Sequence, residues 1–244
     1  MRNIKVTISF CGTAYHGFQR QINAVGIQNV IEDILSVMLN EKAVIYGCSR
    51  TDTGVHANMY CFSFRTESRI PCKNLVRGLN ALLPDDIAVQ SAEDVPPDFH
   101  ARYCCRGKEY VYLIMNKEIK DPFLSDRALH YPYDLNIDEM KRAAAYFEGK
   151  HDFASFCGTA NLKENSVRNI EYASVIQDES FVKFVVKGDG FLYNMVRIMV
   201  GTLLGVSEGS IACADIPALM DARDRVKAGR TAKPYGLYLN KVFY

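Results

Sequence analysis

The sequence predicts an α+β protein with a mostly antiparallel sheet. Three observations lead to this fold class. Short segments in which apolar and polar residues alternate, typical of half-buried strands, occur in both halves of the chain. Between them lie segments whose apolar residues recur every three or four positions, which indicates amphipathic helices. The strands form hairpin-like pairs more often than strand–helix–strand repeats, and this favours antiparallel pairing.

In the first half, Ile4, Val6, Ile8 and Phe10 alternate with polar residues and so predict a strand. The next segment has its apolar residues at helical spacing, and a second helix is expected to end before Pro84. The expected strands are residues 4–10, 60–65 and 86–95, and the expected helices are residues 26–40 and 72–84.

In the second half, two alternating segments are separated by a polar turn at residues 177–180 and predict a hairpin. The expected strands are residues 107–116, 168–177, 180–190 and 236–244, and the expected helices are residues 136–153, 191–206 and 215–224. The first of these helices is expected to stop near Gly149, and Pro217 lies near the start of the last.

A domain boundary near residue 105 is expected, because residues 1–105 and 106–244 then each hold several strands and at least two helices. The first part carries the polar loop described below, and the second carries a tyrosine-bearing strand and an arginine-bearing helix. No Gly/Ser/Pro-rich linker marks the boundary, so we expect the two halves to share one sheet or to pack tightly.

Composition indicates a soluble globular protein, since 48% of the residues are hydrophobic and 23% are charged. The formal net charge is only +1, so binding to RNA would require positive charge gathered on one face. The eight cysteines contain no C-x-x-C pair and predict no zinc site. Reduced thiols and the absence of a signal peptide or a long apolar run indicate a cytoplasmic protein without a membrane span.

The stretch YGCSRTDTGVHAN, residues 46–58, crowds hydrogen-bonding side chains into a short segment. Asp52 and Gly54 alone are typical of an ordinary turn. A turn has no need of Arg50, Thr51 and His56, so an active site is the alternative. The D-T-G triplet also occurs in aspartic proteases, but those need two such loops, and here Ser, Arg and Thr precede the aspartate in place of apolar residues.

Arg197 is the second candidate site residue. The helix expected at residues 191–206 is apolar almost all round, and a buried guanidinium costs several kcal/mol unless an anion pairs with it. Its partner could be a nearby carboxylate such as Asp189, which would make the pair structural. The alternative partner is Asp52, brought in from the other half of the chain.

Tyr110 and Tyr112 lie on one face of the strand expected at residues 107–116, near Arg106 and Lys108. They could stack on unpaired bases, although core packing is the more common role of tyrosines in strands. Basic residues form three groups, which could follow a phosphate backbone or simply be solvated: Arg65, Arg69, Lys73 and Arg77; Arg102, Arg106 and Lys108; Arg223, Arg225, Lys227, Arg230 and Lys233.

Five ordered segments resemble the tRNA pseudouridine synthase A family. The octapeptide RTDTGVHA, from Arg50 to Ala57, is similar to the R-T-D-x-G-V-H-A motif of that family. The other four segments are CGTAYHGFQRQ, DFHARYCCRGKEYVY, GFLYNMVRIMVGTLL and TAKPYGLYL. Together they run from residue 12 to residue 239.

This resemblance implies a pseudouridine synthase fold, in which two related α/β halves share a mostly antiparallel central sheet with a cleft between them. It implies an isomerase that converts uridine to pseudouridine at positions 38, 39 and 40 of the tRNA anticodon arm. It also implies a homodimer that binds tRNA and needs neither a cofactor nor a metal. The alternative is a non-catalytic tRNA-binding or tRNA-folding protein on the same scaffold.

The resemblance also implies roles for individual residues. Asp52 is expected to be the nucleophile and Arg197 the cation paired with it. Tyr110 is expected to pack against the target uracil, Arg50 to help displace the base, and Leu237 to make an apolar contact with the uracil. The chain departs from the family pattern at Cys48 and Ser49, where Ala-Gly or Gly-Ala is common, and at Ala-Lys-Pro near the end, where Ala-Pro-Pro is usual.

Overall fold

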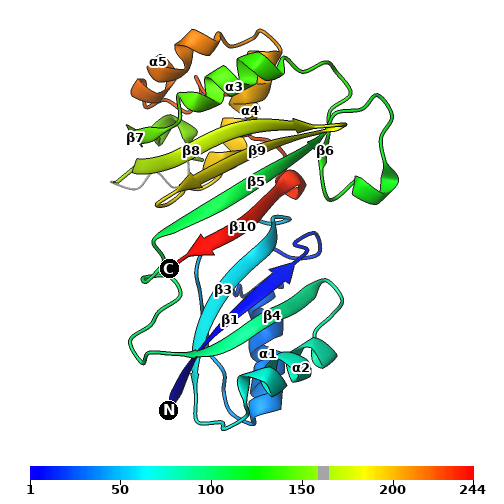
Figure 1. Ribbon diagram of the computed structural model, residues 1–244, viewed down its shortest axis with the longest axis vertical. Helices are drawn as coiled ribbons and strands as arrows, with labels where there is room; N and C mark the ends of the chain where they lie inside the picture. Colours follow the sequence, from blue (N-terminus) through cyan, green and yellow to red (C-terminus); the bar gives the residue numbers. More distant parts are fainter. Residues whose placement is uncertain (159–164) are drawn as a thin grey trace. The chain divides into compact units, whose positions relative to one another are not determined.

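The computed structural model describes residues 1–158 and 165–244. Within this part the chain forms two compact units. The first comprises Met1–Arg106 together with Tyr238–Tyr244, and the second comprises Gly107–Leu237. Each unit combines a mostly antiparallel sheet with helices (Figure 1), so the predicted α+β class is confirmed.

The sheet of the first unit has the strand order β4-β1-β3-β10, and β2 pairs with β3 in addition. All of these pairs are antiparallel except β10 with β3, which is parallel. The elements of this unit are β1 (Arg2–Phe10), α1 (Ile27–Leu39), β2 (Ile45–Gly47), β3 (His56–Thr66), α2 (Cys72–Leu82), β4 (Ile87–Val95) and β10 (Leu237–Phe243).

The core of the first unit follows from the alternation in its strands. Val6 lies opposite Phe62, and Ile4 lies opposite Phe64, so these buried side chains share one face of the sheet. The helix α2 packs on β4 and contacts α1, and both helices turn buried apolar residues inward. The alternating pattern therefore placed the apolar side chains of β1 in the core, whereas β3 is buried on both faces over residues 60–64.

The sheet of the second unit has the strand order β5-β9-β8-β7, and β6 runs parallel beside β5. Its helix α3 contacts β8 and α4, and α4 contacts β5. The strands and α-helices are β5 (Gly107–Met115), β6 (Leu129–His130), α3 (Ile137–Ala145), β7 (Gly149–Asp152), β8 (Val167–Asp178), β9 (Phe181–Gly188), α4 (Met195–Ser207) and α5 (Ile216–Asp221). Short 3-10 helices lie at Pro122–Leu124, Ala154–Phe156, Cys213–Asp215 and Pro234–Gly236.

Several predicted elements have different bounds in the structure. The helix expected to stop near Gly149 ends at Ala145, because a strand begins at that glycine, whose φ is +98°. The helix expected from residue 191 starts at Met195, because Asn194 has a left-handed backbone with φ +60°. The short strands β2, β6 and β7 were not predicted, since two to four residues are too few to show a period.

Candidate active site

The loop that carries Asp52 spans residues 48–55 and connects β2 to β3 in the first unit. Its last part is more regular than the sequence indicated, because β3 already starts at His56. Asp52 is half-buried, and its carbonyl accepts a hydrogen bond from the backbone nitrogen of Val55 at 3.2 Å, which closes a tight turn. Gly54, with φ +77°, supplies the left-handed backbone that this turn needs.

Tyr60 fixes the start of this loop through hydrogen bonds to Ser49. Its fully buried ring stacks on Phe18, with ring centroids 4.0 Å apart and an interplanar angle of 21°. Its hydroxyl donates a hydrogen bond to the carbonyl oxygen of Ser49 and accepts one from the Ser49 backbone nitrogen at 3.4 Å. A buried ring thus fixes the backbone three residues before Asp52.

The segment between β1 and α1 packs against the other side of the loop. The backbone nitrogen of Gly54 donates to the carbonyl of Tyr15 at 3.3 Å. A Cβ atom on Gly17 would lie 2.2 Å from the carbonyl oxygen of Thr51, and one on Gly12 would lie 1.9 Å from that of Val55. Only glycine permits such close backbone approach, which explains the glycines at positions 12 and 17 of this segment.

Tyr15 also anchors this segment through its side chain. Its hydroxyl donates a hydrogen bond to Asp86 Oδ1 at 2.7 Å. Burial, together with the neighbouring carboxylate of Asp86, raises the pKa of Tyr15 well above its usual value. The phenol therefore stays neutral and keeps donating at any physiological pH.

His56 has a structural role here. It is buried, and its Nδ1 accepts a hydrogen bond from the Gly12 backbone nitrogen at 3.0 Å. Its ring also stacks on Tyr238 of β10, with centroids 4.7 Å apart. Through these two contacts the imidazole connects the segment around Gly12 to β10 within the first unit.

The two residues that flank Asp52 on its N-terminal side differ in exposure. Arg50 is exposed, so its guanidinium can reach a ligand. The hydroxyl oxygen of Thr51 is buried and has no hydrogen-bond partner within the described part of the chain. An unpaired buried hydroxyl costs about 1–3 kcal/mol, and such groups in native proteins are often found at functional sites.

The structure accounts for the departure at Cys48 and Ser49. Cys48 is buried, and its backbone nitrogen donates to the Cys61 carbonyl at 2.8 Å, so it continues the β2–β3 pairing. Neither residue is among the described residues with a positive φ. The loop therefore does not use a glycine's conformational freedom at this point, and serine is accommodated without backbone strain.

The remaining predicted site residues lie in the second unit. Tyr110 on β5 is buried, and its ring meets Phe191 edge to face, with centroids 5.0 Å apart. Tyr112 is fully buried and donates its hydroxyl to the Lys233 carbonyl at 2.8 Å, so it belongs to the core. Both tyrosines are buried, so they form no exposed stacking platform, and the alternative of core packing describes Tyr112.

Arg197 lies in the first turn of α4 and is half-buried, whereas we expected it in the middle of a fully buried helix. The helix starts later than its apolar pattern, which moves the arginine to its amino-terminal end. Its Nε donates to the Ala232 carbonyl at 2.7 Å and its Nη1 to Asn194 Oδ1 at 2.7 Å. The guanidinium is thus held in a fixed direction by its own unit.

Leu237 is buried and begins β10, directly after the 3-10 helix at Pro234–Gly236. A Cβ atom on Gly236 would lie 2.7 Å from the ring of Tyr112, so this turn packs tightly on β5. The structure therefore groups Tyr110, Arg197 and Leu237 in the second unit, while Asp52 and Arg50 lie in the first.

Most of the third basic group is engaged within the protein. Arg223 pairs with Asp152 at 2.9 Å, and Arg230 pairs with Glu208 at 2.7 Å. Arg225 donates to the carbonyls of Ala228 and Gly229 and to the Thr231 hydroxyl, and burial lowers its pKa. This run of cations therefore stabilises a loop to a large extent and does not form a row of unpaired phosphate ligands.

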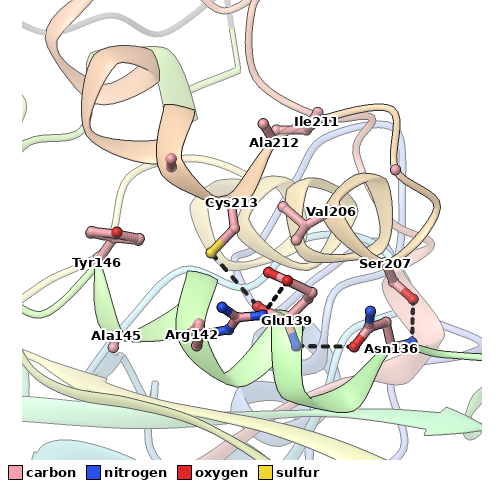
Figure 2. Close-up of a pocket in the computed structure, with 12 residues that line it drawn as sticks. Asn136, Glu139, Arg142, Ala145, Tyr146, Val206, Ser207, Ile211, Ala212 and Cys213 are labelled. Atoms are coloured by element: carbon pink, nitrogen blue, oxygen red, sulfur yellow. Dashed lines mark hydrogen bonds and ion pairs between the residues drawn. The ribbon is translucent and has the colours of Figure 1, made fainter.

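The second unit also contains a cavity of about 940 Å³ between α3, the end of α4 and the segment around Cys213 (Figure 2). None of the five predicted site residues lines it. Its polar groups bond one another: Glu139 pairs with Arg142, and the Asn136 backbone nitrogen donates to Ser207 Oγ at 2.8 Å. With these groups already paired, the cavity has no convergent reactive side chains.

Neither a metal site nor a membrane helix is found in the described ranges 1–158 and 165–244. No three His, Cys, Asp or Glu side chains come together in a way that could hold a metal ion. No helix is both long and apolar enough to cross a bilayer.

Sequence reasoning identified the loop but not the groups that hold it. Tyr60 gave no signal beyond its place in an alternating strand, and the unpaired Thr51 hydroxyl could not be distinguished from any other threonine. Both depend on neighbours more distant in sequence than a local pattern reaches.

Comparison with known proteins shows the family of the chain. The model of a family described as tRNA pseudouridine synthase matches residues 6–104 and 143–244. A protein of Acetivibrio thermocellus named tRNA pseudouridine synthase A is 45% identical over 244 residues, covering 100% of both chains. One of Thermoanaerobacter sp. strain X514 with the same name is 42% identical over 244 residues, again covering both chains completely.

Among solved structures, a chain in the crystal structure of a Cbf5-Nop10-Gar1 complex aligns with 97% of this chain and 48% of its own length. That alignment has a TM-score of 0.38 and 17% identity. The family model covers well over half of the chain, and the relatives match it from end to end. The chain therefore belongs to the tRNA pseudouridine synthase family, which is a family of isomerases.

Proposed function

We propose that the protein isomerises uridine to pseudouridine at positions 38, 39 and 40 of the tRNA anticodon arm, with Asp52 as the nucleophile. The observation that carries this proposal is that contacts with the surrounding backbone and with Tyr60 fix the Asp52 loop in place. Tyr60 fixes its start, Gly12 and Gly17 pack against its backbone, and Gly54 closes its turn. A loop held from three sides can present one carboxylate in a defined position.

The reaction breaks the bond between C1′ of the ribose and N1 of uracil, turns the ring, and joins C1′ to C5. The proton on C5 leaves to solvent, and N1 gains one, so the reaction needs no oxidant or reductant. The Asp52 carboxylate can form a covalent bond to C1′ or can add to C6 of the ring. Either route requires an ionised aspartate and the exclusion of water.

The other site residues would bind and orient the nucleotide. Arg197 would keep Asp52 ionised, because a nearby guanidinium typically lowers the pKa of a carboxylate by about 1–3 units. Tyr110 would pack on the uracil ring, and Leu237 would contact it from an apolar surface. Arg50, which is exposed, would help the uridine leave its stack, a step that costs a few kcal/mol.

At the level of the assembly, we propose a cytoplasmic homodimer that binds tRNA. The relatives named tRNA pseudouridine synthase A in Acetivibrio thermocellus and Thermoanaerobacter support tRNA as the substrate. The family assignment leaves no support for the aspartic-protease alternative, whose second D-T-G loop the sequence does not contain.

The test uses tRNA labelled with tritium at C5 of uridine. Asp52→Asn should abolish release of the label, a loss of at least about 10³-fold, while tRNA still binds. The matched control is Asp138→Asn, which removes an exposed carboxylate from α3 and should leave release unchanged. Turnover retained in Asp52→Asn would refute its role as nucleophile. Tight tRNA binding by the unaltered protein without any label release would favour the non-catalytic alternative.

A further inference from the structure

Three aromatic rings form an exposed row on the first unit. The His100 ring lies 5.1 Å from that of Tyr46 and 4.4 Å from that of Tyr103, measured between centroids. Tyr46 is 48% exposed and Tyr103 is 78% exposed, so the two outer rings present large flat surfaces to solvent. We call these three residues the aromatic row.

The segment that carries two of these rings is fixed to the sheet. The side-chain amide of Asn3 donates to the carbonyls of Pro96 and Phe99, both at 2.9 Å. The Ala101 backbone nitrogen donates to Ser63 Oγ at 3.2 Å, and the Tyr244 hydroxyl donates to the Ala101 carbonyl at 2.9 Å. The aromatic row is therefore preorganised, and a ligand would lose little affinity to its ordering.

The aromatic row lies on the sheet face opposite the helical core. Tyr46 pairs with Ser63 in the β2–β3 register, whereas the neighbouring Ile45 pairs with Phe64 of the core. Since successive side chains alternate between faces, Tyr46 points away from the core. It also lies six residues before Asp52, in the strand that leads into the Asp52 loop.

The charges around the aromatic row favour an anionic partner. Arg102 and Arg106 are exposed and make no ion pair within the described part of the chain. Arg50 is exposed as well, in the loop that follows β2. Asp98 is the one acidic residue between positions 96 and 106. Exposed flat rings beside unpaired arginines are the combination that binds unpaired nucleotides, with stacking on the bases and cations near the phosphates.

We propose that the aromatic row is a stacking site for an unpaired nucleobase of the RNA substrate, separate from the pocket for the target uridine. The proposal rests on the proposed function insofar as the ligand is RNA. The base would stack on the two outer rings, Tyr46 and Tyr103. His100 contacts both rings and keeps them in place. The site serves to position the RNA and takes no part in the bond changes.

The test measures tRNA binding in the Asp52→Asn background by fluorescence anisotropy. Tyr46→Ala and Tyr103→Ala should each weaken binding about 5- to 100-fold, the usual loss when a stacking ring is removed. Tyr46→Phe and Tyr103→Phe keep the ring and should bind within about twofold of the parent. The control Tyr133→Ala removes a tyrosine of the second unit that is 70% exposed and should leave binding unchanged.

Two further measurements distinguish stacking from other roles. A single-stranded RNA that contains 2-aminopurine should lose fluorescence on binding, and this quenching should disappear in the alanine variants. The slope of binding against salt concentration should stay the same, because no phosphate contact is lost. Unchanged melting temperatures would show that the variants remain folded.

Unchanged binding in both alanine variants would overturn the proposal. So would equal losses in the phenylalanine variants, since the hydroxyls and not the rings would then matter. A change in oligomeric mass at unchanged tRNA affinity would identify the row as a protein contact instead. If the unaltered protein releases no tritium, the proposed function fails, while the quenching experiment still decides the stacking site.

Discussion

At the scale of single residues, the shape of the Asp52 loop depends on contacts between backbones. Gly17 has a φ of +80°, and a Cβ atom there would lie 2.2 Å from the Thr51 carbonyl oxygen. Thr51 is directly bonded to Asp52, so any movement of that carbonyl changes the position of the carboxylate. A residue with no reactive group of its own thus controls the geometry of the site.

Gly17→Ala should therefore lower both stability and activity. We expect a loss of more than about 2 kcal/mol in the free energy of unfolding, from the left-handed backbone and the clash together, and a fall in tritium release of tenfold or more. The matched control is Gly209→Ala, where φ is +74° but nothing lies within 4 Å of the added methyl group. Gly209→Ala should lower the free energy of unfolding by about 1 kcal/mol and leave activity unchanged. Equal effects of the two substitutions would contradict a specific role for the Gly17 contact.

At the scale of elements, the cationic segment between α5 and β10 is mainly a structural loop. Arg225 donates three hydrogen bonds to the loop itself, at 3.3, 2.9 and 2.9 Å. The same loop supplies the Ala232 carbonyl that receives the Nε of Arg197. The loop thus links the end of α5 to the orientation of a proposed site residue, and three of its cations, Arg223, Arg225 and Arg230, bond to groups within the protein.

Arg225→Gln should destabilise the protein by about 2–3 kcal/mol, because carbonyls that now accept from a guanidinium would lose their donor. Lys227→Gln, two residues later on the exposed surface, should change stability by no more than about 0.5 kcal/mol. Chemical denaturation of both variants measures the difference. If Arg225→Gln instead weakened tRNA binding at unchanged stability, the segment would be a phosphate-binding surface after all.

At the scale of the whole molecule, the chain does not divide into two consecutive pieces. Its last seven residues, Tyr238–Tyr244, belong to the first unit, where β10 runs parallel to β3 (Figure 1). Leu239 of this strand is fully buried and lies opposite Ala57, and Tyr238 stacks on His56. The two ends of the chain therefore contribute to one hydrophobic core.

Leu239→Ala should destabilise the first unit selectively, by about 2–5 kcal/mol, since it leaves a cavity in that core. Hydrogen exchange should accelerate for the amides of β1, β3 and β4 and change little in the β8–β9 hairpin. The control Met59→Ala shortens an exposed apolar side chain on β3 and should cost less than about 1 kcal/mol. Uniform acceleration in both units would show that they unfold as one.

The sequence by itself determined the features that depend on local spacing. Period-two segments became β1, β3, β4, β5, β8, β9 and β10, and helical spacing became α1, α2, α3, α4 and α5. The five ordered motif segments, among them the octapeptide from Arg50 to Ala57, indicated the family that the comparisons established. Alternation and motif spacing are properties of neighbouring residues, so no knowledge of the fold is needed to recognise them.

Tertiary structure alone decided the features that depend on distant partners. Tyr60 meets Ser49 across 11 positions, Gly17 meets Thr51 across 34 positions, and Tyr46 meets His100 across 54 positions. The late start of α4, which places Arg197 in its first turn, depends on the left-handed backbone at Asn194 and not on hydrophobic spacing. Such contacts arise only when the folded sheet brings separate segments together, because closing the chain between them is favourable only in the presence of the rest of the core.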